Sequence, residues 1–205
     1  MATFPTHKDL LVARSPFFTK ALTTYTTTAP NPSIETAPWT EGHTCIVKLP
    51  DDDPHVFANH LPILYTGSVP TCQEPIKITT DGATEKGKAE ADRKHKFAMA
   101  KAFRDSWNLV VRLYTFCENI QDLQTRQLLL VAMVQETNIS TGDKQQHHPG
   151  PRSVTLLYNG TVDGDLVRKF LRDTGVWYGH EGWSSHVSLY PQEYLANVVA
   201  GMWEH

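Results

Sequence analysis

The chain has 205 residues, of which 40% are hydrophobic, and this length suits one domain or one domain with an appendage. Its formal net charge of −3 offers no positive surface for nucleic acid or for an anionic membrane, so we expect neither as a partner. No apolar run approaches the roughly 20 residues that span a bilayer, and the N-terminus lacks the basic-then-apolar pattern of a secretory signal.

The first predicted elements are two short helices that meet at a Ser-Pro hinge. Leu10 and Leu11 begin an apolar face with helical spacing. Ser15 fits an N-cap, and Pro16 fits the first position of the second helix, where a missing N–H costs nothing. Val12 lies off the apolar face of the first helix, which makes it a candidate contact for a partner protein.

A loop, a strand and a longer helix are predicted next. Residues 23–43 are rich in Thr and Pro and lack periodicity, so we expect a solvated loop insertion. Thr44–Leu49 is β-branched and predicts a strand. A helix then begins at the N-cap Asp53 and ends at Gly67, with Pro62 predicting either a kink or a late start.

The middle of the chain predicts a charged insertion followed by two helices. Residues 68–95 are strongly charged with few large apolar side chains, which indicates a flexible or disordered surface insertion. Apolar residues recur at helical spacing from Phe97 to Cys117. A further helix begins at the N-cap Asp122 and continues to about Gln135, and its apolar run "LLLVAMV" predicts burial on several sides.

The last third predicts a smaller unit. Residues 153–158 are interpreted as a strand, and Asp163 as the cap of the helix that follows. The aromatic and glycine-rich residues 175–186 are predicted to form a loop, either covering the core of this unit or forming a ligand pocket or partner anchor. Pro191 opens a final helix.

No set of residues in the sequence has the spacing of a catalytic or metal site. The adjacent pair His147 and His148 lacks a further ligand at metal-binding spacing, and His55 and His60 lie five apart on one helix. Cys117 has no local signature of a nucleophile and is expected to be a small buried thiol. We therefore expect no catalytic residue, no cofactor and no metal.

The cysteines also bear on the compartment. They are three in number and show no CxxC spacing, which is typical of reduced thiols. We expect an intracellular protein, in either cytoplasm or nucleus.

Two segments resemble the signature segments of the BTB/POZ domain, "FPTHKDLLVARSPFF" and "VKLPDDDPHVFANHLPILYTGSV". The helical segment "LVVRLYTFCENIQDLQTRQLLLVAMV" and the C-terminal tail are similar to the short BTB proteins of filamentous fungi. The resemblance implies an α+β fold, in which a helical cluster packs on a short β-sheet that lacks the family's N-terminal strand. Residues 1–140 would form this domain, and residues 141–205 a small helical C-terminal extension.

The resemblance also implies a function. BTB domains are protein–protein interaction modules without catalysis, which self-associate or dock a partner. We therefore expect a scaffold that forms a weak homodimer, because strand exchange between copies requires the missing strand. Two alternatives stay open. One is an adaptor for a cullin-type ubiquitin ligase scaffold, since Glu74 ends a loose match to the hydrophobic-x-Glu element. The other is a small enzyme or ligand-binding protein that uses the aromatic loop.

The predicted core follows from the apolar faces of these helices. Its members come from five predicted helices and are expected to share one cluster: Leu10, Leu11, Phe18, Phe57, Leu61, Tyr114 and Leu129.

Overall fold

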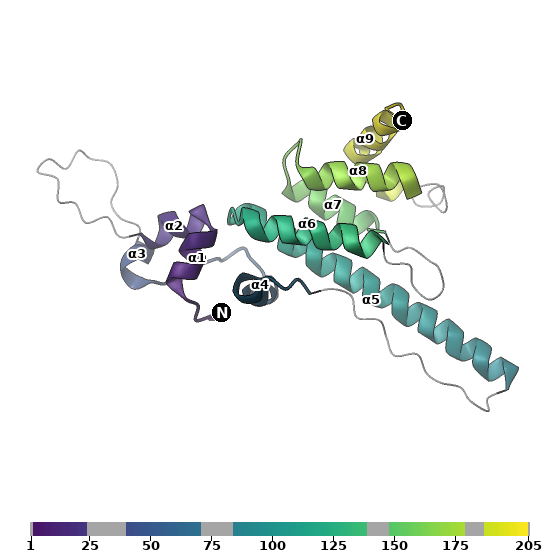
Figure 1. The fold of residues 1–205 in the computed structure, drawn as a ribbon, viewed down its shortest axis with the longest axis horizontal. Coiled ribbons are helices and arrows are strands. Elements are labelled where there is room, and N and C mark those ends of the chain that lie inside the picture. The colour runs from purple at the N-terminus through teal and green to yellow at the C-terminus, as the bar shows by residue number, and fades with distance from the viewer. Residues whose placement is uncertain (1, 24–39, 71–83, 139–147, 179–186, 205) are drawn as a thin grey trace, which may run out of the picture.

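All the regular secondary structure of the described residues is helical in the computed structural model, in which residues 2–23, 40–70, 84–138, 148–178 and 187–204 are described (Figure 1). The elements are α1 (Lys8–Arg14), α2 (Pro16–Leu22), α3 (Thr40–Thr44), α4 (Pro54–Thr66), α5 (Glu85–Asn119), α6 (Leu123–Asn138), α7 (Pro151–Gly160), α8 (Leu166–Tyr178), the 3₁₀ turn η2 (Val187–Leu189) and α9 (Gln192–Met202).

The predicted α+β fold is wrong, because no residue in the described ranges belongs to a β-strand. In the first predicted strand, Thr44 instead ends α3, and Cys45 follows with a left-handed φ of 54° that interrupts an extended chain. Residues 153–158 lie in α7, where Val154, Leu157 and Tyr158 are buried on one side of the helix. Their spacing of three and four is helical, so this period prevails over the β-branched composition.

The capping signals of α2 and α4 are confirmed. The Ser15 hydroxyl accepts a hydrogen bond from the Phe18 backbone N–H at 3.2 Å, and Asp53 accepts one from His55 at 2.7 Å. Gly67 ends α4 with a φ of 71°, a conformation that costs glycine little. The helix around Pro62 does not begin late, since α4 starts at Pro54.

The insertion predicted at residues 68–95 is wrong over its last part, because α5 already begins at Glu85. Thr84 caps this helix by accepting from the Gly87 backbone N–H at 3.3 Å. Ion pairs three and four residues apart, such as Lys88 with Glu85, stabilise an exposed helix even without apolar contacts. The first turns of α5 project beyond the other helices (Figure 1). Residues 71–83 lie outside the described ranges.

The second half of α5 is the centre of the molecule. Helices α4, α6 and α7 pack against it, and α8 packs on α7 and α9. One continuous cluster of buried apolar residues runs from α1 to α9. Of the predicted core, four residues are buried in this cluster and three pack against it while partly exposed: Leu11, Phe18, Tyr114 and Leu129 in the first group, Leu10, Phe57 and Leu61 in the second.

A polar network joins the C-terminal helices to the centre. The Tyr114 hydroxyl donates to Asp165 at 2.7 Å, and Arg126 donates to the other oxygen of this carboxylate. Asp165 also accepts from the Val167 backbone N–H at 2.9 Å and so caps α8. The prediction of Asp163 as this cap is wrong, because the helix begins two residues later than the sequence pattern indicated.

Candidate functional site: a groove between α6 and α8

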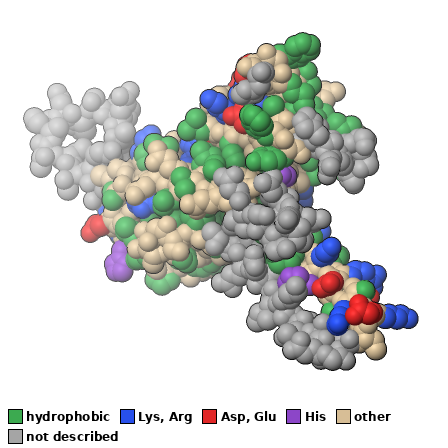
Figure 2. Space-filling view, turned by 45° about the vertical axis from the view of Figure 1, so that its right-hand side comes forward, with side chains coloured by type: hydrophobic (Ala, Val, Ile, Leu, Met, Phe, Trp, Pro, Cys, Tyr) green, Lys and Arg blue, Asp and Glu red, His purple; other side chains and the backbone are tan. Residues whose placement is uncertain are grey.

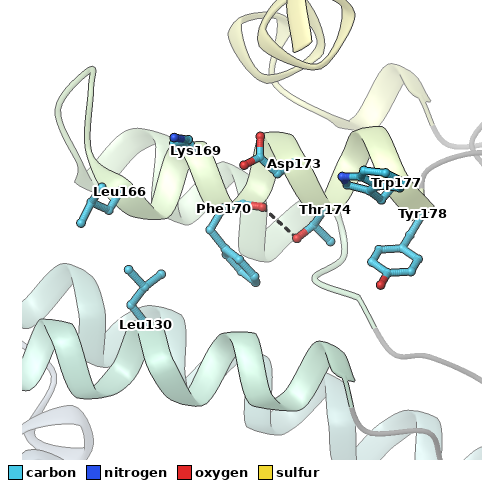
Figure 3. Close-up of a pocket in the computed structure, with 8 residues that line it drawn as sticks. All are labelled: Leu130, Leu166, Lys169, Phe170, Asp173, Thr174, Trp177 and Tyr178. Atoms are coloured by element: carbon cyan, nitrogen blue, oxygen red, sulfur yellow. Dashed lines mark hydrogen bonds between the residues drawn. The ribbon is translucent and has the colours of Figure 1, made fainter. Parts of the chain in front are cut away.

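An apolar groove of about 480 Å³ lies between α6 and α8. Figure 3 shows Leu130 pointing into it from α6 and Phe170 pointing towards it from α8. All other lining residues come from α8, whose exposed side forms one wall: Leu166, Lys169, Asp173, Thr174, Trp177 and Tyr178.

Helix α8 is apolar on two sides. Val167 and Leu171 are buried in the core cluster. A second side, about a third of a turn round the helix, carries Leu166 and Trp177, which are 64% and 66% exposed. A helix at the surface of a globular domain ordinarily shows one apolar stripe and a polar outer face. The exposed side of α8 therefore goes beyond what the core of this domain requires.

Helix α6 contributes Leu130 to the groove and exposes a further apolar residue elsewhere. Its run "LLLVAMV" buries Leu129 and Met133, but Val131 is 55% exposed. The prediction that this helix is buried on several sides is thus wrong, because the side that carries Val131 is exposed. Figure 2 shows hydrophobic side chains gathered over the C-terminal helices, whereas charged side chains gather at the projecting end of α5. Large exposed apolar patches are typical of interaction surfaces.

Two charged residues lie within this apolar stripe. Lys169 and Asp173 are one helical turn apart on α8. Asp173 accepts a hydrogen bond from the Arg172 guanidinium at 2.9 Å and keeps a partly exposed side chain. Lys169 is exposed, and no acidic side chain in the described ranges pairs with it. The groove therefore offers one cation and one anion beside apolar contacts.

A second candidate is a buried polar cluster at the junction of α4, α5 and α6. His60, Cys117 and Asp122 each offer a ligand atom, and these atoms lie within 4.8 Å of one another. His60 Nε2 and an Asp122 oxygen are 3.0 Å apart. All three side chains are almost fully buried. Their fold-dependent proximity was not visible in the sequence, because each residue comes from a different helix or cap.

The electrostatics of this cluster do not favour a nucleophile. Burial alone would raise the pKa of Asp122, but hydrogen bonds from His60 and Thr125, with Arg14 nearby, lower this pKa to about 2. Burial raises the pKa of the Cys117 thiol well above its usual range, and the Asp122 charge adds to this effect. A protonated, enclosed thiol is a poor nucleophile. The described geometry thus indicates a structural network around the α6 cap.

The partner contacts predicted from the sequence lie elsewhere. Val12 is half-buried and packs against the core cluster, and Glu74 lies outside the described residues. Their roles stay predictions. The predicted aromatic loop begins later than expected, since Gly175 to Tyr178 continue α8. His148 stacks on Tyr178 with ring centroids 4.6 Å apart, and His147 lies outside the described residues.

Comparison of the sequence with protein-family models and with curated proteins, and of the fold with solved structures, finds no match. Among the helices of the described ranges, none combines the length and the apolar character needed to cross a bilayer.

Proposed function

We propose that this chain is a non-catalytic protein–protein interaction module that contacts its partner through the groove between α6 and α8. The observation that carries this proposal is the exposed apolar stripe of α8, with Leu166 and Trp177 at its two ends. Fully burying one such side chain is worth about 1.5–3 kcal/mol. Aromatic anchors beside aliphatic residues are also the usual centre of a protein interface.

The alternatives are less well supported by the described residues. The cullin-type adaptor depends on Glu74, which lies outside the described ranges. A small enzyme would need convergent polar groups in an accessible cleft. The groove instead contains mainly apolar side chains, and the titratable cluster around Asp122 is enclosed in the core. A small apolar ligand in the groove remains an outcome of the experiment.

The experiment compares two matched substitutions. Leu166→Asp places a charge in the exposed stripe, and Phe97→Asp places one at a 71% exposed site on the projecting part of α5. A partner captured by the wild-type chain is purified, and its affinity for each variant is measured by calorimetry.

We expect Leu166→Asp to weaken binding by at least about tenfold, or about 1.4 kcal/mol, because a charge would replace an apolar contact that binding buries. Phe97→Asp should bind as the wild type does. Equal affinities for all three proteins would overturn the proposal. Saturation of the groove by a small apolar molecule, with no protein bound, would favour the ligand-binding alternative.

A further inference from the structure

The exposed side of α8 is self-complementary in charge. Lys169 and Asp173 are separated by one turn and lie on the same stripe as Leu166 and Trp177. When two copies of one helix pack antiparallel about a twofold axis, positions at equal distances on either side of the axis face each other. The residue midway between Lys169 and Asp173 is position 171. An axis there brings each lysine opposite the aspartate of the other copy.

The apolar residues favour the same register. The midpoint of Leu166 and Trp177 falls only half a residue beyond position 171. One axis position therefore allows both ion pairs between the copies to form. It also packs Leu166 of each copy against Trp177 of the other. Phe170 then lies beside the axis, next to its own symmetry mate.

Neighbouring registers are disfavoured by the same charges. An axis at position 169 would place the two copies of Lys169 opposite each other. An axis at position 173 would place the two copies of Asp173 opposite each other. Like charges held opposite each other at an interface oppose association and so select the register. Lys169 has no competing acid in the described ranges, and Asp173 shares only one oxygen with Arg172.

From this complementarity we infer that the groove partner is a second copy of this chain, packed through antiparallel α8 helices about a twofold axis at position 171. The inference rests on the proposed function and names the partner of that surface. A helix of 13 residues is about 20 Å long. Such a contact is shorter than a standard interface, although Leu130 of α6, which lines the same groove, adds to it. The dimer is therefore weak and forms at micromolar or higher concentrations.

Charge-reversal variants test the register. Lys169→Asp alone turns both cross-pairs into two aspartates, and Asp173→Lys alone turns both into two lysines. An equimolar mixture of the two variants restores complementary pairs in a heterodimer. Lys101→Asp, on the exposed surface of α5, is the matched control.

Sedimentation velocity over a range of concentrations measures the association. We expect each α8 variant to dimerise at least about tenfold more weakly than the wild type, while the mixture and the Lys101→Asp control dimerise as the wild type does. High salt should reduce the differences. A mixture that associates no better than its components overturns the antiparallel register.

The two proposals fail differently. A wild-type chain that stays monomeric at several hundred micromolar overturns the homodimer alone, provided that Leu166→Asp still weakens binding of another protein. Insensitivity of every protein contact to Leu166→Asp overturns the proposed function as well.

Discussion

Asp122 holds together the junction of three helices. Its carboxylate accepts from the Thr125 backbone N–H at 2.9 Å and so caps α6, while the Thr125 hydroxyl donates at 2.6 Å. The remaining contacts are with His60 at 3.0 Å and with the Arg14 guanidinium at 3.5 Å. One buried carboxylate thereby links α1, α4 and α6.

The stability of this junction should depend on pH in the acid range. The folded-state pKa of Asp122 is about 2, below the ordinary value of 3.8. A depressed pKa contributes stability that is present above the unfolded-state pKa and is lost as the pH falls through the folded-state pKa. The contribution amounts to about 2 kcal/mol at neutral pH and disappears between about pH 4 and pH 2.

Asp122→Asn tests this linkage, because asparagine is also a good N-cap but carries no charge. We expect the free energy of unfolding at pH 7 to fall by about 2 kcal/mol, and the difference from wild type to shrink towards pH 2. Urea unfolding at several pH values measures it, with Asp51→Asn at an exposed position as control. A difference that is constant with pH would contradict the pKa assignment.

The same residue bears on metal binding. Both oxygens of Asp122 already accept hydrogen bonds, and the positive charge of Arg14 lies beside them. These features oppose a cation, whereas His60 Nδ1, which has no hydrogen-bond partner in the described part of the chain, would favour a ligand. The charge of Arg14 and the hydrogen bonds to both Asp122 oxygens outweigh this feature and disfavour a bound cation.

We therefore predict no stoichiometric zinc in the untagged protein, and no rise in its melting temperature when zinc is added. Elemental analysis and a thermal melt measure these quantities. One zinc per chain that is lost in Cys117→Ala would contradict the prediction, and would make the buried cluster a metal site.

Most single residues with a local signal were predicted well, although Asp163 was named as a cap in place of Asp165. Ser15, Asp53 and Asp122 were each identified as helix caps, because a cap bonds to a backbone N–H within three residues. The proximity of His60 to Asp122 depends instead on how α4 and the start of α6 cross α5. No feature within the sequence neighbourhood of either residue carries this information.

Among the contacts between helices, the one between the end of α7 and α5 leaves no room for a larger side chain. A Cβ added at Gly160 would lie 2.4 Å from Thr115 Cγ2 and 2.9 Å from Thr115 Cβ. Gly160 is therefore required for the close approach of the end of α7 to α5. Contacts of this length force the neighbouring side chain or the helix itself to move.

Gly160→Ala should lower the free energy of unfolding by about 1–3 kcal/mol, the cost of overpacking. Thr115→Ser removes the nearest methyl group, so the double variant should recover part of the loss. Gly150→Ala, where nothing lies within 4 Å of the added Cβ and φ is −74°, is the control. Thermal unfolding of the four variants measures the coupling, and additive effects would show that the two helices separate easily.

The two wrong strand predictions and the wrong linker prediction share one cause. Thr44–Leu49 and residues 153–158 were interpreted as strands from composition, yet a strand needs a partner, and the described ranges contain none. The charged segment from Glu85 was interpreted as a linker because it lacks large apolar residues. Its ion pairs and its continuity with the apolar half of α5 make it helical. Tertiary context decided each case.

At the scale of the whole molecule, the apolar surface and the predicted interface lie apart. Val12, the candidate partner contact on the first helix, is partly buried against the core cluster, and its role stays a prediction. The exposed stripe lies on α8, which is on the other side of α6 from α1 (Figure 1). The core residues were predictable from helical periodicity. The groove was not, because a second apolar side on α8 looks like core in the sequence.

The apolar cluster also predicts how the molecule unfolds. Val154 and Leu157 of α7 are fully buried, and α7 packs directly on α5. The Arg126–Asp165 ion pair joins α6 to the start of α8. The C-terminal helices therefore have no core that is separate from the rest. We expect residues 1–140 and 141–205 to unfold in one cooperative transition rather than as two domains.

Leu157→Ala tests this cooperativity, because it removes a fully buried side chain and should cost about 2–5 kcal/mol. In urea, circular dichroism and the fluorescence of the buried Trp107 in α5, recorded with the other four tryptophans replaced by phenylalanine, should shift to lower midpoints by the same amount, although the substitution is in α7. A chain of residues 148–205 alone should be unfolded, since its apolar face on α7 would have nothing to pack against. Separate midpoints for the two signals, or a folded fragment, would show that the C-terminal helices form an independent domain.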